Sequence, residues 1–271
     1  MCKKFSLVLC ALVVVTLMSG VAQAWTLVDD FESYSTGDTA TVTGGVWSSK
    51  VDDSTSEIAA SGSGQVLQIS KLAGSGGWDG SDMDLTGTGA ALAIGETQTY
   101  FWQVSIHTDW ETTSWTYDCM MGLSPDVSNI DQVDAWRDFS VMPFINNAPA
   151  TPFINAIAPT TPWWAPMTMD TWTNVWVVVN NDVVDPTFDL YYSTGLDAAV
   201  LVAGDADWRN FAGNVDLNAI GFMAGGWDLS SYSFDNVYYA DGVDLTNPVP
   251  EPATMVLLGF GSLALIRRRK S

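Results

Sequence analysis

Apolar and polar residues alternate with a period of two along several short stretches of this chain. The clearest is TYFWQVSIH at residues 99–107. Its apolar set is Tyr100, Trp102, Val104 and Ile106, and its polar set is Gln103, Ser105 and His107. Because successive side chains of a β-strand point to opposite sides, this pattern predicts a strand with one buried face and one polar face.

Similar stretches recur along the chain and are separated by turn-forming sequences rich in Gly and Ser. They lie at residues 26–31, 65–70, 137–145, 151–157, 173–180, 187–193, 217–224 and 233–240. No segment keeps a 3.6-residue apolar period for more than three turns, which argues against long amphipathic helices. We therefore predict an all-β fold, a single domain over residues 25–246 that is a sandwich or a barrel. In this interpretation DGSDMD (79–84) is a loop, and Asp205-Ala206-Asp207 lies in a turn.

Both ends of the chain have the layout of export signals. Residues 1–24 combine Lys3 and Lys4, an uncharged apolar run and the small-residue site Ala22-Gln23-Ala24, so we predict a signal peptide that signal peptidase removes. At the other end, fourteen uncharged residues (253–266) precede four cationic ones (267–270). As a helix this stretch is about 21 Å long, shorter than a bilayer core of about 30 Å. It fits a short, transient inner-membrane anchor better than a core helix.

The last residues, VPEPATMVLLGFGSLALIRRRK, resemble the PEP-CTERM sorting signal of Gram-negative bacteria. We place that signal at residues 247–271. The resemblance implies recognition by an exosortase, a membrane-bound processing enzyme, and delivery to the cell surface or to extracellular polysaccharide. It assigns the recognition role to a Pro-Glu-Pro motif and a basic cluster, here Pro250, Glu251, Pro252, Arg267, Arg268 and Arg269.

The charge of the body excludes some partners. Of the 31 acidic residues, all but Glu251 lie in residues 25–249, whereas only four of the ten Lys and Arg do, so the body carries a net charge of −26. Such a body repels nucleic acid, which we exclude as a partner. It also offers many oxygen ligands for calcium. Cys119 is the single cysteine of the mature chain, so no internal disulfide is possible, and we expect it to pack as a small hydrophobe.

The body also resembles the concanavalin A-like, laminin-G-like jelly roll. The resemblance rests on an opening DDFESY (29–34), a closing FDNVYYADG (234–242), and a central VWVVVN followed by FDLYYS. In that group the first and last strands often hold a structural calcium between them. The matching carboxylates here would be Asp30 or Glu32 from the first and Asp235 from the last. Asp82 and Asp84 are spaced like part of a calcium loop, but the glycine and the distal glutamate of an EF-hand are missing.

Enzymes of this fold group leave recognisable motifs, and this chain lacks them. Laminarinase-like glycosidases use Glu-x-Asp-x-x-Glu on one strand, and none of Glu32, Glu57, Glu96 and Glu111 has a partner at that spacing. Alginate lyases of this fold carry Gln-Ile-His, but here Ser105 replaces the glutamine before Ile106 and His107, and their arginine-rich and Tyr-rich motifs are missing. His107 is the only histidine, and we expect a surface position for it rather than a role as a base. We therefore assign no catalytic residue.

Carbohydrate binding needs aromatic rings for the apolar face of a sugar and polar groups for its hydroxyls. If the strands at 99–107, 173–180 and 187–193 share a sheet, one face would present Gln103, His107, Trp176 and Tyr191. The pair Trp163-Trp164, in a predicted loop, is a second place where aromatic rings would be exposed. We expect a non-catalytic protein that binds extracellular polysaccharide. The alternatives are a polysaccharide-degrading enzyme and a purely structural matrix or adhesive protein.

Overall fold

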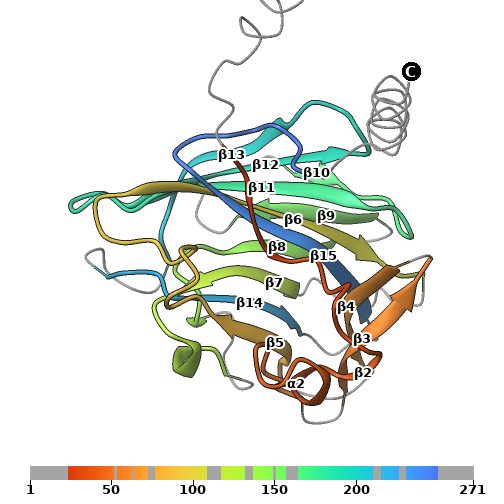
Figure 1. Cartoon of the computed structure of the whole chain (residues 1–271). Coiled ribbons are helices and arrows are strands. Elements are labelled where there is room, and N and C mark those ends of the chain that lie inside the picture. Colours follow the sequence, from red (N-terminus) through yellow and green to blue (C-terminus); the bar gives the residue numbers. More distant parts are fainter. Residues whose placement is uncertain are drawn as a thin grey trace, which may run out of the picture.

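A computed structural model of the chain describes residues 24–51, 54–62, 64–72, 77–108, 117–131, 137–148, 151–156, 164–209, 215–225 and 230–249. These residues form a sandwich of two antiparallel sheets (Figure 1). The predicted all-β fold, a two-sheet sandwich as the resemblance to concanavalin A-like domains implies, is therefore confirmed. The signal peptide at 1–24, apart from Ala24, and the sorting signal from Pro250 onward lie outside the described residues, and the domain boundaries stay predictions.

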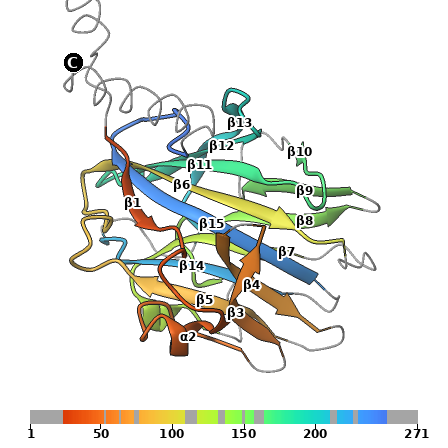
Figure 2. The ribbon, with the colours of Figure 1, turned by 45° about the vertical axis from the view of Figure 1, so that its right-hand side comes forward.

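The larger sheet has nine strands in the order β13-β12-β11-β6-β15-β4-β3-β2, with β1 also paired to β15 (Figure 2). Strands distant in sequence are neighbours here, since β6 lies between β11 and β15. The strands are β1 (Thr26–Asp29), β2 (Gly37–Asp38), β3 (Thr55–Ser61), β4 (Gly64–Lys71), β6 (Thr97–Ile106), β11 (Thr173–Asn180), β12 (Thr187–Thr194), β13 (Val200–Asp207) and β15 (Ser230–Asp241).

The smaller sheet has six strands in the order β10-β9-β8-β7-β14-β5. Its strands are β5 (Asp79–Asp84), β7 (Tyr117–Ser124), β8 (Pro143–Ala148), β9 (Thr151–Ala156), β10 (Ala165–Pro166) and β14 (Ala219–Ala224). The described helices are two short turns, α2 (Thr39–Val42) and the 3-10 helix η1 (Val127–Asn129). No helix in the described part of the chain is long and apolar enough to cross a membrane.

The main core lies between the two sheets and is filled by the apolar sets of the alternating strands. The four apolar residues of β6 are all buried there, as the pattern predicts. Phe222 of β14 is at its centre, with its ring stacked 4.3 Å from Phe234 and 5.7 Å from Trp47. Cys119 is not in a disulfide and is buried in the same core, which confirms the expectation that it packs as a small hydrophobe. Stability comes from this apolar packing, which is the dominant favourable contribution to folding.

Two acidic stretches differ from the sequence-based prediction. DGSDMD is not a loop but strand β5, and its Asp79 and Asp82 face the only two lysines of the body. Lys71 donates to Asp79 Oδ2 over 2.9 Å with both side chains buried, and Lys50 pairs with Asp82. These contacts occupy the carboxylates, because a buried charge is costly unless it has a partner. Asp205-Ala206-Asp207, predicted as a turn, is the end of edge strand β13.

The segment predicted as a strand at 137–145 begins later than expected. β8 starts at Pro143, and before it Val141 forms only an isolated bridge to Leu123. Phe139 and Met142 instead pack on the side of the six-stranded sheet that faces away from the nine-stranded sheet. The apolar residues before Pro143 therefore cover this second side of the six-stranded sheet. They do not extend the hydrogen-bonded pairing of β8 with β7.

Candidate functional site

The polar set of β6 lies on the side of the nine-stranded sheet that faces away from the main core, which we call the outer face. The registers place Gln103 opposite Asn174 of β11, and Trp176 opposite Tyr191 of β12. Gln103, Trp176 and Tyr191 therefore share the outer face, as their spacing predicts. His107 lies just beyond the end of β6, where its Nε2 is 2.7 Å from Ser233 Oγ.

Amide side chains on the outer face are bonded to one another across four strands. Asn236 Nδ2 of β15 donates to Gln103 Oε1 over 2.8 Å, and Gln103 Nε2 donates to Asn174 Oδ1 over 2.8 Å. Asn174 Nδ2 continues the chain to Ser193 Oγ at 3.3 Å and to the carbonyl of Gly195 at 2.7 Å. Both functional atoms of the Gln103 amide are thus engaged within the protein. A sugar hydroxyl would have to add to this network or replace one of its bonds.

Trp176 lies on the outer face but is only 1% exposed. Its indole Nε1 donates to the backbone carbonyl of Thr246 over 3.0 Å, and its ring lies against Phe101, with centroids 5.1 Å apart. Residues 242–249, which we call the exit segment, lead from β15 over this part of the sheet. Stacking of a sugar on Trp176 would therefore require the exit segment to move away, whereas Tyr191 on the next strand is half-buried.

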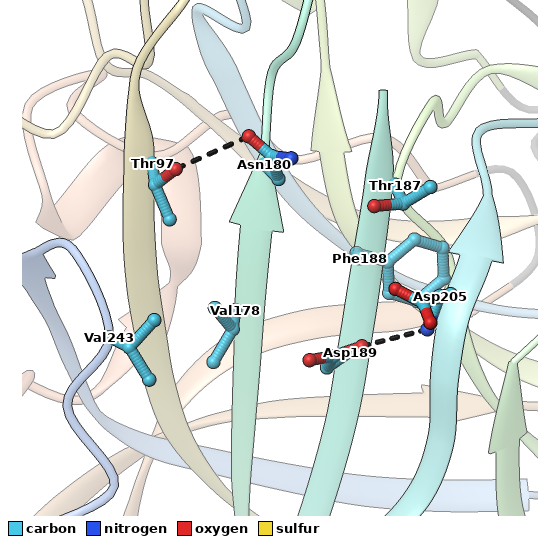
Figure 3. A pocket seen from close by; sticks show the side chains of 8 residues that line it. All are labelled: Thr97, Val178, Asn180, Thr187, Phe188, Asp189, Asp205 and Val243. Carbon is cyan, nitrogen blue, oxygen red and sulfur yellow. Dashed lines mark hydrogen bonds between the residues drawn. The ribbon is translucent and has the colours of Figure 1, made fainter. Parts of the chain in front are cut away.

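Beside these residues the outer face is hollowed into a polar pocket of about 280 Å³ (Figure 3). Its walls come from β6, β11, β12, β13 and the exit segment. They are Thr97, Val178, Asn180, Thr187, Phe188, Asp189, Asp205 and Val243.

Asp189 and Asp205 lie together on one side of the pocket, and Val243 lies on the other (Figure 3). The Asp205 N–H donates to Asp189 Oδ1 over 2.8 Å, and Thr97 Oγ1 donates to Asn180 Oδ1 over 3.3 Å. Val243 is 62% exposed, so the pocket has one apolar rim. The pocket therefore offers carboxylate and amide oxygens and hydroxyls for hydrogen bonds, beside one apolar rim.

Tyr191 is not one of the wall residues, but it follows the wall residue Asp189 by two positions on the same face of β12. Partial burial, and then the neighbouring Asp189 and Asp205 carboxylates, raise the pKa of the Tyr191 hydroxyl. The phenol therefore stays protonated at neutral pH and can donate a hydrogen bond. The sequence singled out Tyr191 but missed Asp189, Asn180 and Asp205. The alternation that places Asn180 on β11 and Asp189 on β12 was visible in the sequence. The pairing of β13 with β12, which brings Asp205 to the pocket, was not.

The three carboxylates predicted to hold calcium come from the segment after β1 and from β15, the strand with which β1 pairs. Burial, and then repulsion from Glu32, Asp30 and Asp29, raise the pKa of Asp235 to about 7. Each of the three also accepts a backbone N–H: Asp235 Oδ1 from Asn236, Asp30 Oδ1 from Glu32, and Glu32 Oε1 from Gln65.

These residues do not complete a calcium shell by themselves. Nowhere in the described ranges do three or more His, Cys, Asp or Glu side chains converge closely enough to hold a metal ion. Asp29 is committed to the core, since its Oδ2 accepts from Tyr34 Oη at 2.8 Å and from Trp47 Nε1 at 2.9 Å. Calcium takes six to eight oxygens, so backbone carbonyls and waters would have to supply most of them. The calcium site at Asp30, Glu32 and Asp235 stays a prediction.

The second aromatic surface, on the six-stranded sheet, is only partly described, because Trp163 lies outside the described residues. Trp164 stacks flat on Phe153 of β9, with ring centroids 4.7 Å apart and an interplanar angle of 6°. It is 50% exposed. Stacking on Phe153 fixes this ring while half of the side chain stays exposed to solvent, so Trp164 is a separate candidate for stacking on a sugar.

Comparisons with known proteins support the sorting signal. Residues 248–270 match the family model described as the PEP-CTERM protein-sorting motif, which confirms the resemblance seen in the sequence. The chain thus carries the mark of an exported protein that an exosortase sorts. The sorting residues themselves, Pro250, Glu251, Pro252 and Arg267 to Arg269, lie outside the described residues.

Among solved structures, the chain is similar in fold to proteins of several activities. Lectin II from Ulex europaeus is 10% identical, with 73% of this chain and 93% of that chain covered and a TM-score of 0.46. The GH131 beta-glucanase catalytic domain from Podospora anserina is 13% identical, with 69% and 76% covered and a TM-score of 0.44. Alginate lyase vAL-1 from Chlorella virus is 11% identical, with 80% and 100% covered and a TM-score of 0.43. None of the curated proteins matches this chain.

Proposed function

We propose that this chain is a non-catalytic polysaccharide-binding protein of the cell surface or extracellular matrix, delivered there by an exosortase. The observation that carries the proposal is the polar pocket on the outer face, whose wall residue Asp189 precedes Tyr191 by two positions on β12. The sorting motif supports the location, since it sends the protein to a compartment where polysaccharides are the abundant polymers.

The composition of the pocket supports binding of a sugar rather than of an anion or a nucleic acid. Asp189 and Asp205 bring negative charge to the wall, which repels phosphates and uronates. Carboxylate oxygens accept strongly from neutral donors such as hydroxyl groups. We therefore expect a polysaccharide with neutral sugar residues to be the preferred ligand.

The non-catalytic part of the proposal rests on the residues of the pocket and on His107. Hydrolysis of a glycosidic bond uses two carboxyl groups in different environments, one held protonated as an acid. Asp189 Oδ1 instead accepts the backbone N–H of Asp205, so the two residues are joined by a structural hydrogen bond. His107 is bonded to Ser233 at the end of β6 and is not among the pocket residues. These groups suit binding better than proton transfer.

The proposal is tested by titrating the full-length protein, in detergent, with exopolysaccharide purified from the host. We expect saturable binding, and we expect the Asp189→Asn and Tyr191→Ala variants to lose about tenfold or more in affinity. The loss of one charged hydrogen bond corresponds to about 1.5–3 kcal/mol, which is at least a tenfold change. Trp164→Ala, on the other sheet, is the matched control and should bind like the wild type.

Two other outcomes would overturn this assignment in different ways. Loss of binding in Trp164→Ala, with Asp189→Asn unaffected, would move the site to the six-stranded sheet. Release of reducing ends or unsaturated sugars during the titration would make the protein an enzyme. If the wild-type protein shows no binding at all, with the sorting signal attached or cut off, the purely structural alternative would be favoured.

A further inference from the structure

The exit segment, which connects the sandwich to the sorting motif, is bonded to the outer face instead of projecting away from it. Gly242 donates its N–H to the Thr97 carbonyl over 2.7 Å, and Thr99 Oγ1 donates to the Gly242 carbonyl over 2.6 Å. The Asp244 N–H donates to Thr99 Oγ1 over 3.0 Å. Further along, the Thr246 carbonyl accepts from Trp176 Nε1. The segment therefore runs from the first residues of β6 toward Trp176 in the middle of β11.

Trp25, the predicted first residue of the mature chain, lies over this segment. Its Nε1 donates to Thr246 Oγ1 over 2.9 Å, and its ring meets Phe101 edge to face with centroids 6.0 Å apart. Asp244 Oδ1 holds Thr246 from the other side, accepting from its N–H at 2.9 Å and its Oγ1 at 2.7 Å. Trp25 precedes β1, which runs beside β15 (Figure 2). Both ends of the body thus meet on the outer face, and Thr246 is fixed there from three sides.

The sorting motif begins immediately after this fixed point. Val249 is the last described residue, is half-buried, and donates its N–H to Asn247 Oδ1 over 2.9 Å. The apolar stretch of the sorting signal starts at Ala253, four residues later. Four extended residues span at most about 14 Å. When that stretch is inserted in a bilayer, the bilayer surface must lie within this distance of Val249.

The polar pocket lies on the same face of the sheet as the exit segment. Val243 of the exit segment is one of its walls, and Val178, another wall, is two residues along β11 from Trp176. Two residues of a strand span about 7 Å, so the pocket adjoins the point where Thr246 is held. The side of the sandwich that carries the pocket is therefore the side from which the anchor leaves.

We propose that the outer face is the membrane-facing side of the anchored precursor, and that the lipid surface covers the pocket until the anchor is removed. The proposal rests on the function proposed above, and it adds that polysaccharide binding begins only after sorting. The short tether, and not an electrostatic attraction to the membrane, fixes this orientation. A body with a net charge of −26 is repelled by anionic lipid. Once cut, the body leaves the bilayer and exposes the pocket.

The test compares the same protein before and after the tether is cut. In the full chain, a six-residue site-specific protease sequence replaces residues 247–252, so that the tether keeps its length. This protein is reconstituted in phosphatidylcholine vesicles and exposed to fluorescently labelled host exopolysaccharide. We expect cleavage to increase binding about tenfold or more. A variant with thirty Gly and Ser residues at the same point should bind without cleavage, because such a linker reaches about 30 Å on average.

A separate experiment measures the orientation of the body on the bilayer with a fluorescent label at the rim of the pocket. Cys119 is buried, so once Cys2→Ser and Cys10→Ser remove the other two thiols of the full chain, a thiol-reactive fluorophore can be directed to Val243→Cys or, as a control on the other sheet, to Trp164→Cys. Spin-labelled lipid should quench the label at position 243 strongly before cleavage and weakly afterwards, and the label at 164 weakly in both states.

The outcomes separate this inference from the proposed function. Equal exopolysaccharide binding before and after cleavage, or equal quenching at positions 243 and 164, would overturn the membrane-facing orientation while leaving the binding function intact. Strong quenching at 243 with no exopolysaccharide binding in any form of the protein would keep the orientation and overturn the function.

Discussion

The two sheets of the sandwich differ most on the sides that face away from the main core. On the nine-stranded sheet this side carries amides, carboxylates and hydroxyls, bonded to one another and covered in part by the exit segment. On the six-stranded sheet the corresponding side is apolar and forms a second buried cluster. This cluster contains Trp78, Met120, Ile130, Phe139, Met142, Phe144, Ala219 and Met223. The outer face of the nine-stranded sheet thus offers polar contacts, whereas the corresponding side of the six-stranded sheet contributes apolar burial to stability.

The second cluster depends on close packing between the sheet and the connection from β7 to β8. Ile130 and Phe139 come from that connection and lie over Gly221 of β14. A methyl group added at Gly221 would lie 3.0 Å from Ile130 Cδ1 and 3.2 Å from the Phe139 ring, so the glycine is what lets both side chains approach the sheet. In the described part of this side, the apolar cover takes the place that an open groove would need.

The largest expected effect of a substitution on either outer side is that of Phe139→Ala. The side chain is fully buried, and removing a buried phenylalanine costs about 3–5 kcal/mol because it loses apolar contact and leaves a cavity. Urea unfolding should show this loss, whereas Thr187→Ala on the pocket wall should stay within about 0.5 kcal/mol of the wild type. A loss for Phe139→Ala no larger than that of the control would mean that the second cluster is not structural.

A smaller effect, dependent on pH, is expected from Asp235→Asn on the nine-stranded sheet. Burial raises the pKa of Asp235 to about 7, whereas an Asp in the unfolded chain has a pKa of about 3.9. Between these values the folded protein binds the extra proton, so the contribution of Asp235 to the free energy of unfolding falls as the pH rises from about 4 to about 7. Above pH 7 the variant should therefore be more stable than the wild type, by about 2 kcal/mol after allowing for solvent screening.

Urea unfolding at pH 5 and pH 8 measures this difference, and the same experiment examines calcium. If Asp30, Glu32 and Asp235 bind the ion, calcium should stabilise the wild type at pH 8 but not Asp235→Asn. A melting temperature unchanged by chelator would contradict the calcium prediction, and an Asp235→Asn variant with the pH dependence of the wild type would contradict the raised pKa.

The smallest effect is expected from the amide network. Gln103→Ala removes the bonds to Asn236 and Asn174, but water can replace part of them because Gln103 is half-buried, so the loss should be about 1 kcal/mol. A double-mutant cycle with Asn174→Ala tests whether the two residues act as a unit. Strictly additive losses would mean that the network does not couple the strands.

Much of the fold could be predicted from the sequence because alternation reports directly which side of a strand is buried. The strands at 99–107, 173–180 and 187–193 correspond to β6, β11 and β12, and their polar sets share the outer face as expected. The strand β5 was missed because DGSDMD has turn composition, and its charges are compatible with a sheet only through pairing with Lys50 and Lys71. β13 was missed because its Gly and Asp residues suit a bulged edge strand as well as a turn.

The candidate site was only partly visible in the sequence, since a pocket needs residues from several strands at once. Tyr191 could be selected because an aromatic residue on a polar face is unusual. The same reasoning selected Trp176, and nothing in its strand indicated that Thr246, seventy residues away, covers it. Asp189 and Asp205 meet only because β13 pairs with β12 through a shifted register.

The sequence by itself determined the features that depend on local order along the chain. These are the two-residue alternation that makes the body all-β, the single cysteine of residues 25–271, and the PEP-CTERM motif at residues 248–270. Only the tertiary structure decided which of the polar residues meet in a pocket and that Phe139 helps to cover the outward-facing side of the six-stranded sheet. It also decided that Trp25 and Thr246 come together on the outer face. The physical reason is that alternation assigns each residue a side of its own strand, whereas strand order and register, set by contacts between distant segments, decide what lies beside it.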